Sequence, residues 1–132
     1  MLDRIDIQVE IVPVPFEKIS DTRPAESSES IRRRVIVARE IQAARFADYP
    51  GIYCNAQMTT RLLNQFAVPE VAGWKRLIDE MPRFHLSARA SDRILKVART
   101  IADLEGSEGV QVQHINEAVN YRNLDRENWG DR

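Results

Sequence analysis

The N-terminal segment alternates apolar and polar residues without interruption from Ile5 to Ile11. Its odd-numbered positions are apolar and its even-numbered positions are polar, and this period of two predicts a β-strand with one apolar face. Pro13 and Pro15 end the strand, because proline cannot donate to the hydrogen-bond ladder of a sheet. Nothing later in the chain predicts a comparable strand. Because a lone strand leaves its backbone groups without partners, we expect it to pair with a copy of itself or with a sheet outside this sequence.

A long helix is predicted after a polar stretch that runs from Lys18 to Ser30. Ser27 or Ser28 can cap its start, and the run from Ile31 to Phe46 contains no Gly or Pro. Its apolar positions form two stripes, which are Ile31, Val35 and Ala38, and Val37, Ile41 and Ala44. Two stripes predict a helix that packs on two sides, and Pro50 closes the segment.

Two shorter helical segments follow in the middle of the chain. Thr59 can cap a short apolar segment, which Pro69 stops. A further helix is predicted over residues 69–81, because proline is tolerated in the first turn of a helix. Pro82 is expected to end this helix, because a proline inside a helix removes a backbone hydrogen bond.

The clearest helical pattern lies in the last third of the sequence. It follows Ser87, which can cap it, and runs without interruption to Glu105, after which Gly106 occupies the position of a C-terminal cap. A last helix is predicted over residues 113–122. Together these segments predict an all-α fold, a bundle of four to five helices preceded by an extended N-terminal arm.

Composition and charge favour one small soluble domain, or one domain with a tail. The chain has 132 residues with 19 basic and 20 acidic side chains, a net charge of -1. Every apolar stretch is interrupted well before the roughly 20 residues that a membrane span needs. The N-terminus lacks the basic start and apolar core of an export signal, and Cys54 is the single cysteine, so we expect a cytoplasmic protein.

No motif in the sequence predicts a complete catalytic or metal site. The glycines do not form a P-loop, so the chain alone cannot hold and hydrolyse a nucleotide in the P-loop manner. His85 and His114 have no further ligand at metal spacing, and Cys54 is interpreted as a buried inert thiol. Most of the basic residues are arginines, and the triplet 32–34 fans around its helix, so we interpret it as surface or interface charge.

Arg89 is the residue whose position most favours a ligand. With Ser87 as the cap, it is the second residue of its helix, beside backbone N–H groups that typically bind anions. A cation at this end opposes the helix dipole by about 0.3–1 kcal/mol, which favours an anionic partner such as a phosphate. The alternative is that this face of the helix is solvated. Arg93 and Lys96 would then form ion pairs with neighbouring residues of the same helix, for instance Lys96 with Asp92.

Three separated motifs occur in a defined order along the chain. They are Leu-Asp-Arg-Ile-Asp-Ile at residues 2–7, the segment from Leu86 to Leu104, and Tyr-Arg-Asn-Leu-Asp-Arg at residues 121–126. Together they resemble the C-terminal portion of magnesium-chelatase-like AAA+ ATPases of the ComM/YifB group. The helix start at 28–34 and the sequence His-Ile-Asn-Glu-Ala at 114–118 extend the resemblance over nearly the whole chain.

The resemblance implies a division of the chain and a role for two arginines. Residues 1–25 would be an extended arm, the last strand of an AAA+ core plus a linker, disordered where that core is missing; residues 26–126 would be the helical lid, and 127–132 a tail. Arg4 would be the arginine finger, which reaches the nucleotide of the neighbouring subunit. Arg89 would be the sensor 2 arginine, which contacts ATP bound to its own subunit.

The same resemblance implies the cofactors, partners and activity of a longer protein. ATP and Mg²⁺ would be bound by the full-length protein and neither by this fragment alone. The partners would be the AAA+ core of the same polypeptide, the neighbouring subunits of a hexameric ring, and DNA, with no membrane. The implied activity is ATP-driven DNA remodelling such as branch migration in natural transformation, with a chelatase-type motor as a variant. The alternative is a free-standing helical module that binds DNA or protein without nucleotide chemistry.

Overall fold

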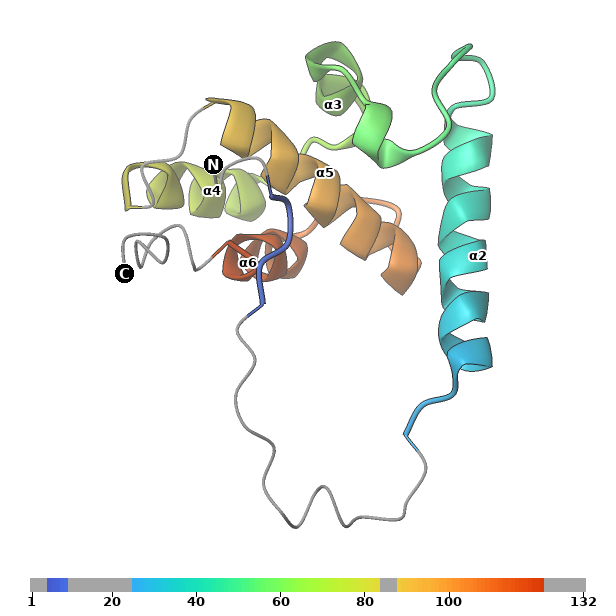
Figure 1. The fold of residues 1–132 in the computed structure, drawn as a ribbon. Coiled ribbons are helices and arrows are strands. Elements are labelled where there is room, and N and C mark those ends of the chain that lie inside the picture. The colour runs from blue at the N-terminus through green and yellow to red at the C-terminus, as the bar shows by residue number, and fades with distance from the viewer. Residues whose placement is uncertain (1–4, 10–24, 84–87, 123–132) are drawn as a thin grey trace, which may run out of the picture.

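The computed structural model of the chain describes residues 5–9, 25–83 and 88–122. Its elements are α2 (Ser28–Arg45), the 3-10 helix η2 (Asn55–Gln57), α3 (Thr60–Phe66), α4 (Val71–Arg83), α5 (Ala88–Glu105) and α6 (Val112–Asn120). The described residues contain no β-strand, and the prediction of an all-α helical bundle is confirmed (Figure 1). Among these helices, none combines the length and the apolar character that crossing a membrane requires.

Helix α5 is the central element of the bundle. It contacts α2, η2, α3 and α6, and α6 in turn contacts α4. The core that joins these elements includes Leu63, Leu77, Ile94, Ile115 and Val119, each almost completely removed from solvent. Full burial of such a side chain stabilises the fold by about 1.5–3 kcal/mol. The core therefore fixes α5, and exposed residues of this helix occur only at its two ends, at Ala88 and Arg89 and at Leu104 and Glu105.

Local capping chemistry sets several helix ends where the sequence predicts them. Ser27 Oγ accepts a 3.1 Å hydrogen bond from the backbone of Ser30, and Thr59 caps α3 in the same way. Gly106 follows α5 with a φ of +79°, the left-handed conformation of a C-terminal cap. The predicted cap Ser87 lies outside the described residues.

The predicted limits of α4 are wrong at both ends. The helix begins at Val71 rather than at Pro69, which instead forms an isolated bridge with Val110. It continues through Pro82, which was expected to end it. A proline in the last turn removes one hydrogen bond without disturbing the earlier turns, and those turns carry the core residue Leu77.

Helix α2 packs on one side only and along part of its length. Ala38 and Gln42 are buried against the bundle, whereas Ile31 and Val35, on the same stripe, are exposed. Val37 on the second stripe is also exposed, so the prediction of packing on two sides is wrong for the described residues. Figure 1 shows the reason: the N-terminal turns of α2 extend past the end of α5.

Residues 5–9 of the arm are extended and lie against the bundle, but no strand pairs with them in the described part of the chain. Their polar side faces inward, with Gln8 only 8% exposed, while Ile5, Ile7 and Val9 are 43%, 53% and 64% exposed. The apolar face that the alternation predicts is therefore not packed into the core. The predicted disorder of residues 1–25 and their pairing with an outside sheet stay predictions.

Candidate functional site

Arg89 occupies the first turn of α5, as the second residue of the helix. Its side chain is exposed and forms no hydrogen bond or ion pair with the described residues. The core residue Ala90 follows it and anchors this turn to the bundle. The guanidinium group is therefore held near the helix N-terminus with its donors available to a ligand.

The other basic residues of α5 all have partners within the protein. Arg93 donates to Asp6 Oδ1 at 2.9 Å, and Lys96 Nζ donates to the carbonyl oxygen of Ala56 at 3.2 Å. The predicted local pairing of Lys96 with Asp92 is wrong, because Asp92 instead accepts a 3.1 Å hydrogen bond from the hydroxyl of Thr60. Tertiary contacts, rather than neighbours on the helix, thus satisfy these charges.

The arm is attached to the bundle by polar contacts at three of its residues. Asp6 receives the hydrogen bond from Arg93, and the buried Arg122 donates to the carbonyl oxygen of Ile5 at 2.9 Å. The backbone N–H of Gln8 donates to the carbonyl oxygen of Tyr121 at 2.5 Å. Arg4, the predicted arginine finger, lies outside the described residues and is bonded directly to Ile5.

A cavity of about 460 Å³ lies between the arm and the helices. Its apolar lining comes from both sides and consists of Ile7, Val9, Ala56, Val97, Ile101, Leu104 and Tyr121. Asp6, Lys96 and Glu117 add charged groups to this lining, whereas Arg89 does not contribute to it. The cavity is thus separate from the exposed arginine at the start of α5.

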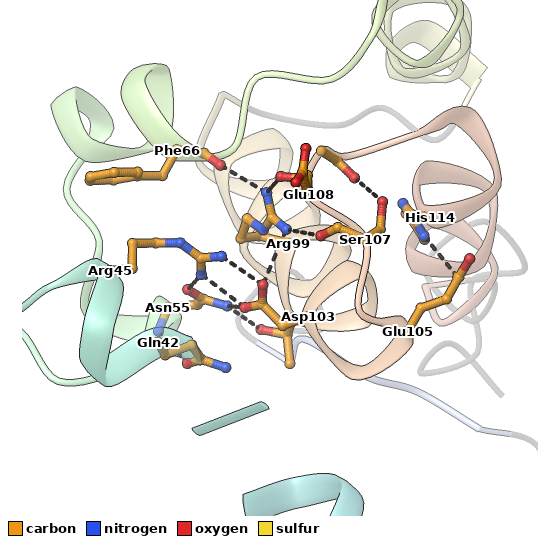
Figure 2. A network of polar contacts seen from close by, with 12 residues as sticks. Gln42, Arg45, Asn55, Phe66, Arg99, Asp103, Glu105, Ser107, Glu108 and His114 are labelled. Carbon is orange, nitrogen blue, oxygen red and sulfur yellow. Dashed lines mark hydrogen bonds and ion pairs between the residues drawn. The ribbon is translucent and has the colours of Figure 1, made fainter. Parts of the chain in front are cut away.

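A buried polar network joins α2, η2 and α5 (Figure 2). Its centre is Asp103, which is fully buried and receives two hydrogen bonds from Arg45, at 2.6 and 2.8 Å. Asn55 Nδ2 donates to the same carboxylate at 2.9 Å, and its backbone N–H donates to Gln42 at 2.9 Å. The carboxylate is thereby paired, as a buried charge must be.

Arg99 completes the network and holds the loop that follows α5. It forms a 3.1 Å ion pair with Asp103 and donates to the carbonyl oxygens of Phe66, Ser107 and Glu108 (Figure 2). Burial lowers the pKa of Arg99, and the nearby charge of Arg45 adds to this, while Asp103 opposes it. Because both terminal nitrogens of its guanidinium group donate within the protein, we assign Arg99 a structural role.

The sequence reasoning missed this network although the sequence holds a signal for it. Arg99 and Asp103 are four residues apart, and Leu95 precedes Arg99 by the same interval. All three are buried on α5, so two charged residues continue a buried face of the helix. Charged residues at such positions indicate a buried ion pair rather than a solvated surface.

Among the described residues, neither His114 nor Cys54 belongs to a metal site, and Cys54 is partly exposed rather than buried as predicted. Buried His114 accepts a hydrogen bond from the backbone of Gln111 through Nδ1 at 2.9 Å, and its Nε2 lies 2.8 Å from Glu105. It thus caps α6. In the described ranges no group of three or more His, Cys, Asp or Glu residues could hold a metal ion, and His85 lies outside these ranges.

Comparison with known proteins identifies the family to which the chain belongs. Residues 25–122 match the family described as magnesium chelatase, subunit ChlI C-terminal. Over 126 residues, 95% of the chain, the sequence is 38% identical to the protein YifB of Salmonella typhimurium and 39% identical to YifB of Escherichia coli. It is 32% identical to competence protein ComM of Haemophilus influenzae over the same share. The chain spans only 24% of the length of these relatives.

Proposed function

Since the chain belongs to the family of magnesium chelatase ChlI C-terminal domains, in its ComM/YifB branch, we propose that it is the helical lid of an AAA+ ATPase. The relatives support a longer protein, because the match covers only 24% of their length and leaves room for a nucleotide-binding core. In this proposal the core holds ATP and Mg²⁺, and the lid supplies charged side chains.

The observation that carries the proposal is the exposed guanidinium group of Arg89, which no other described residue contacts through a hydrogen bond or an ion pair. Arg93, Lys96 and Arg99 on the same helix are engaged by other described residues, whereas Arg89 is exposed at the helix start with none of them as a partner. A guanidinium group fits phosphate oxygens through parallel charged hydrogen bonds. Arg89 therefore acts as sensor 2, contacting the phosphates of ATP bound to its own subunit.

The residues of this chain fit the phosphates of the cofactor but offer no place for its metal ion. The sequence has no P-loop motif, and no carboxylate cluster of metal-binding size occurs in the described ranges. Mg²⁺ would therefore be bound by the core together with the nucleotide. This division makes the chain inactive as an isolated lid.

Arg4 is the second residue of the proposed ATPase chemistry. As an arginine finger it would reach the nucleotide of a neighbouring subunit in a ring and stabilise the charge that develops during phosphoryl transfer. The docking of residues 5–9 supports this role, because Arg122 fixes the carbonyl oxygen of Ile5, the next residue along the chain. The finger would then move together with the lid.

The substrate of the proposed motor is DNA. One relative carries the name competence protein, and this supports a role in remodelling DNA during natural transformation, as in branch migration. Hydrolysis of ATP by the ring would move DNA strands, so branched DNA should stimulate the hydrolysis more than plain duplex does. A chelatase-type motor would show no such stimulation.

The first test is the size of the native polypeptide, measured by immunoblot with an antibody against this chain. A band several-fold larger than 15.2 kDa is expected, whereas a band at 15.2 kDa would favour a free-standing helical module.

In the longer protein, Arg89→Ala should lower the ATP hydrolysis rate by roughly 10²–10³-fold, the effect of removing one charge-stabilising donor. The matched control is Arg39→Ala, which removes an exposed arginine from α2. Equal rates for the two variants would contradict the proposal.

A further inference from the structure

We propose that the ion pair of Asp6 with Arg93 couples the arm to α5, so that the two proposed nucleotide contacts move as one unit. This inference rests on the proposed function, in which Arg89 and Arg4 contact two different nucleotides. Asp6 and Arg93 are positioning residues, since neither needs to touch ATP. The pair would transmit the state of one nucleotide site to the next around the ring.

The spacing along α5 gives the pair its position. Arg93 follows Arg89 by four residues, and side chains at this interval lie on the same face of a helix, one turn apart. Ile94 and Leu95, which follow Arg93 directly, are buried in the core. A displacement of the first turn of α5 is therefore passed to Arg93 through a rigid helix rather than absorbed by a loop.

The arm is held in a way that makes it responsive to this contact. It does not pack its apolar face on the bundle, since Ile5, Ile7 and Val9 are exposed. Beneath it lies the cavity of about 460 Å³, which Ile7 and Val9 line together with residues of α5. Among residues 5–9, the attachment thus includes polar contacts at Ile5, Asp6 and Gln8, with Gln8 buried against the bundle.

The pair of Asp6 and Arg93 differs from the other two attachments in its chemistry. Arg122 binds the carbonyl oxygen of Ile5, and Gln8 donates its backbone N–H, so neither contact depends on which arm side chain is present. The side chains of Arg93 and Asp6 are 24% and 44% exposed, so the ion pair is partly solvated. The energetic contribution of such a pair is modest, so loss of one partner weakens the docking of the arm without unfolding the bundle.

Hydrogen exchange on this chain tests the docking itself. Asp6→Asn keeps the shape of the side chain and removes its charge, so the amide of Gln8, which donates to Tyr121, should exchange roughly two- to fivefold faster, the change that loss of a partly exposed ion pair produces. Asp6→Glu should preserve slow exchange. The control Asp92→Asn removes a carboxylate from α5 that contacts Thr60 and not the arm. Unchanged exchange in Asp6→Asn would overturn the inference.

Steady-state kinetics of the longer protein test the coupling. Asp6→Asn should lower kcat at least fivefold with little change in KM for ATP, Asp6→Glu should restore most of kcat, and Asp92→Asn should behave as wild type. A loss in which KM rises, or that Asp6→Glu fails to restore, would contradict a positioning role. If Arg4→Ala abolishes hydrolysis and Asp6→Asn does not alter it, the inference fails and the proposed function stands. If wild type hydrolyses no ATP, both fail.

Discussion

Arg45 and Asp103 form a bidentate ion pair that joins α2 to α5 across 58 positions of the chain. The carboxylate of Asp103 is fully buried, and the side chain of Arg45 is 11% exposed. Helix α2 buries few apolar residues, chiefly Ala38, against the bundle. The orientation of α2 therefore depends on this charged contact and its neighbours Asn55 and Gln42 more than on apolar packing.

Replacing Asp103 by Ala is expected to destabilise the fold by about 3–5 kcal/mol, the cost of breaking a buried ion pair by removing one partner. The reason is that Arg45 and Arg99 would face each other in the interior without the carboxylate that both contact. Urea unfolding monitored by circular dichroism measures this loss.

The exposed pair of Glu29 and Arg33 provides the control for this experiment. Glu29→Ala removes a carboxylate from α2 whose partner is fully solvated, so the free energy of unfolding should change by less than about 1 kcal/mol. Equal losses for the two variants would show that the burial of Asp103 has no energetic consequence, against the role we assign to the network.

Gly73→Ala should destabilise the protein, although alanine normally stabilises a helix interior by about 1 kcal/mol relative to glycine. A Cβ at Gly73 would lie 2.9 Å from Cβ of Pro69 and 3.4 Å from Cγ1 of the core residue Ile115. Overpacking of this kind costs about 1–3 kcal/mol. Thermal unfolding should give a lower Tm for Gly73→Ala and a nearly unchanged one for Gly109→Ala, whose Cβ would meet nothing within 4 Å. A higher Tm for Gly73→Ala would mean that α4 can move away from α6.

The exposed half of α2 gives a prediction about packing. Ile31→Ala should change the free energy of unfolding of this chain by less than about 0.5 kcal/mol, because the side chain of Ile31 is exposed. Leu63→Ala in the core should cost about 2–5 kcal/mol. A large loss at Ile31 in urea unfolding would show that the exposed turns of α2 are packed in solution.

Local chemistry allowed most of the fold to be predicted from the sequence. The caps Ser27 and Thr59 and the C-terminal glycine Gly106 act within one turn, so their neighbours along the chain are sufficient to predict them. The identification of a ComM/YifB relative from separated motifs is confirmed by the family match.

The features that sequence reasoning missed depend on contacts between distant segments. Pro82 is tolerated in α4 because the core contacts of this helix precede it. The arm turns Gln8 inward because Arg122 binds the carbonyl oxygen of Ile5 and Tyr121 binds the backbone N–H of Gln8. Arg99 and Asp103 are residue types that are usually exposed, and only the approach of Arg45 from α2 makes their burial favourable. Of these contacts, only the pair of Arg99 and Asp103, four residues apart on one helix, leaves a signal in the local pattern.

The available donors of Arg89 lead to a prediction about ATP and this chain alone. One charged hydrogen-bonding side chain contributes about 1.5–3 kcal/mol, and a dissociation constant of 1 mM already requires about 4 kcal/mol. ATP titrated into the isolated chain should therefore not saturate below about 1 mM, while the amide of Arg89 should shift in NMR spectra more than that of Arg39. Arg89→Ala should abolish this local shift. Micromolar binding would mean that the chain holds a nucleotide site of its own. The proposal that the core holds ATP and the lid only contacts its phosphates would then be wrong.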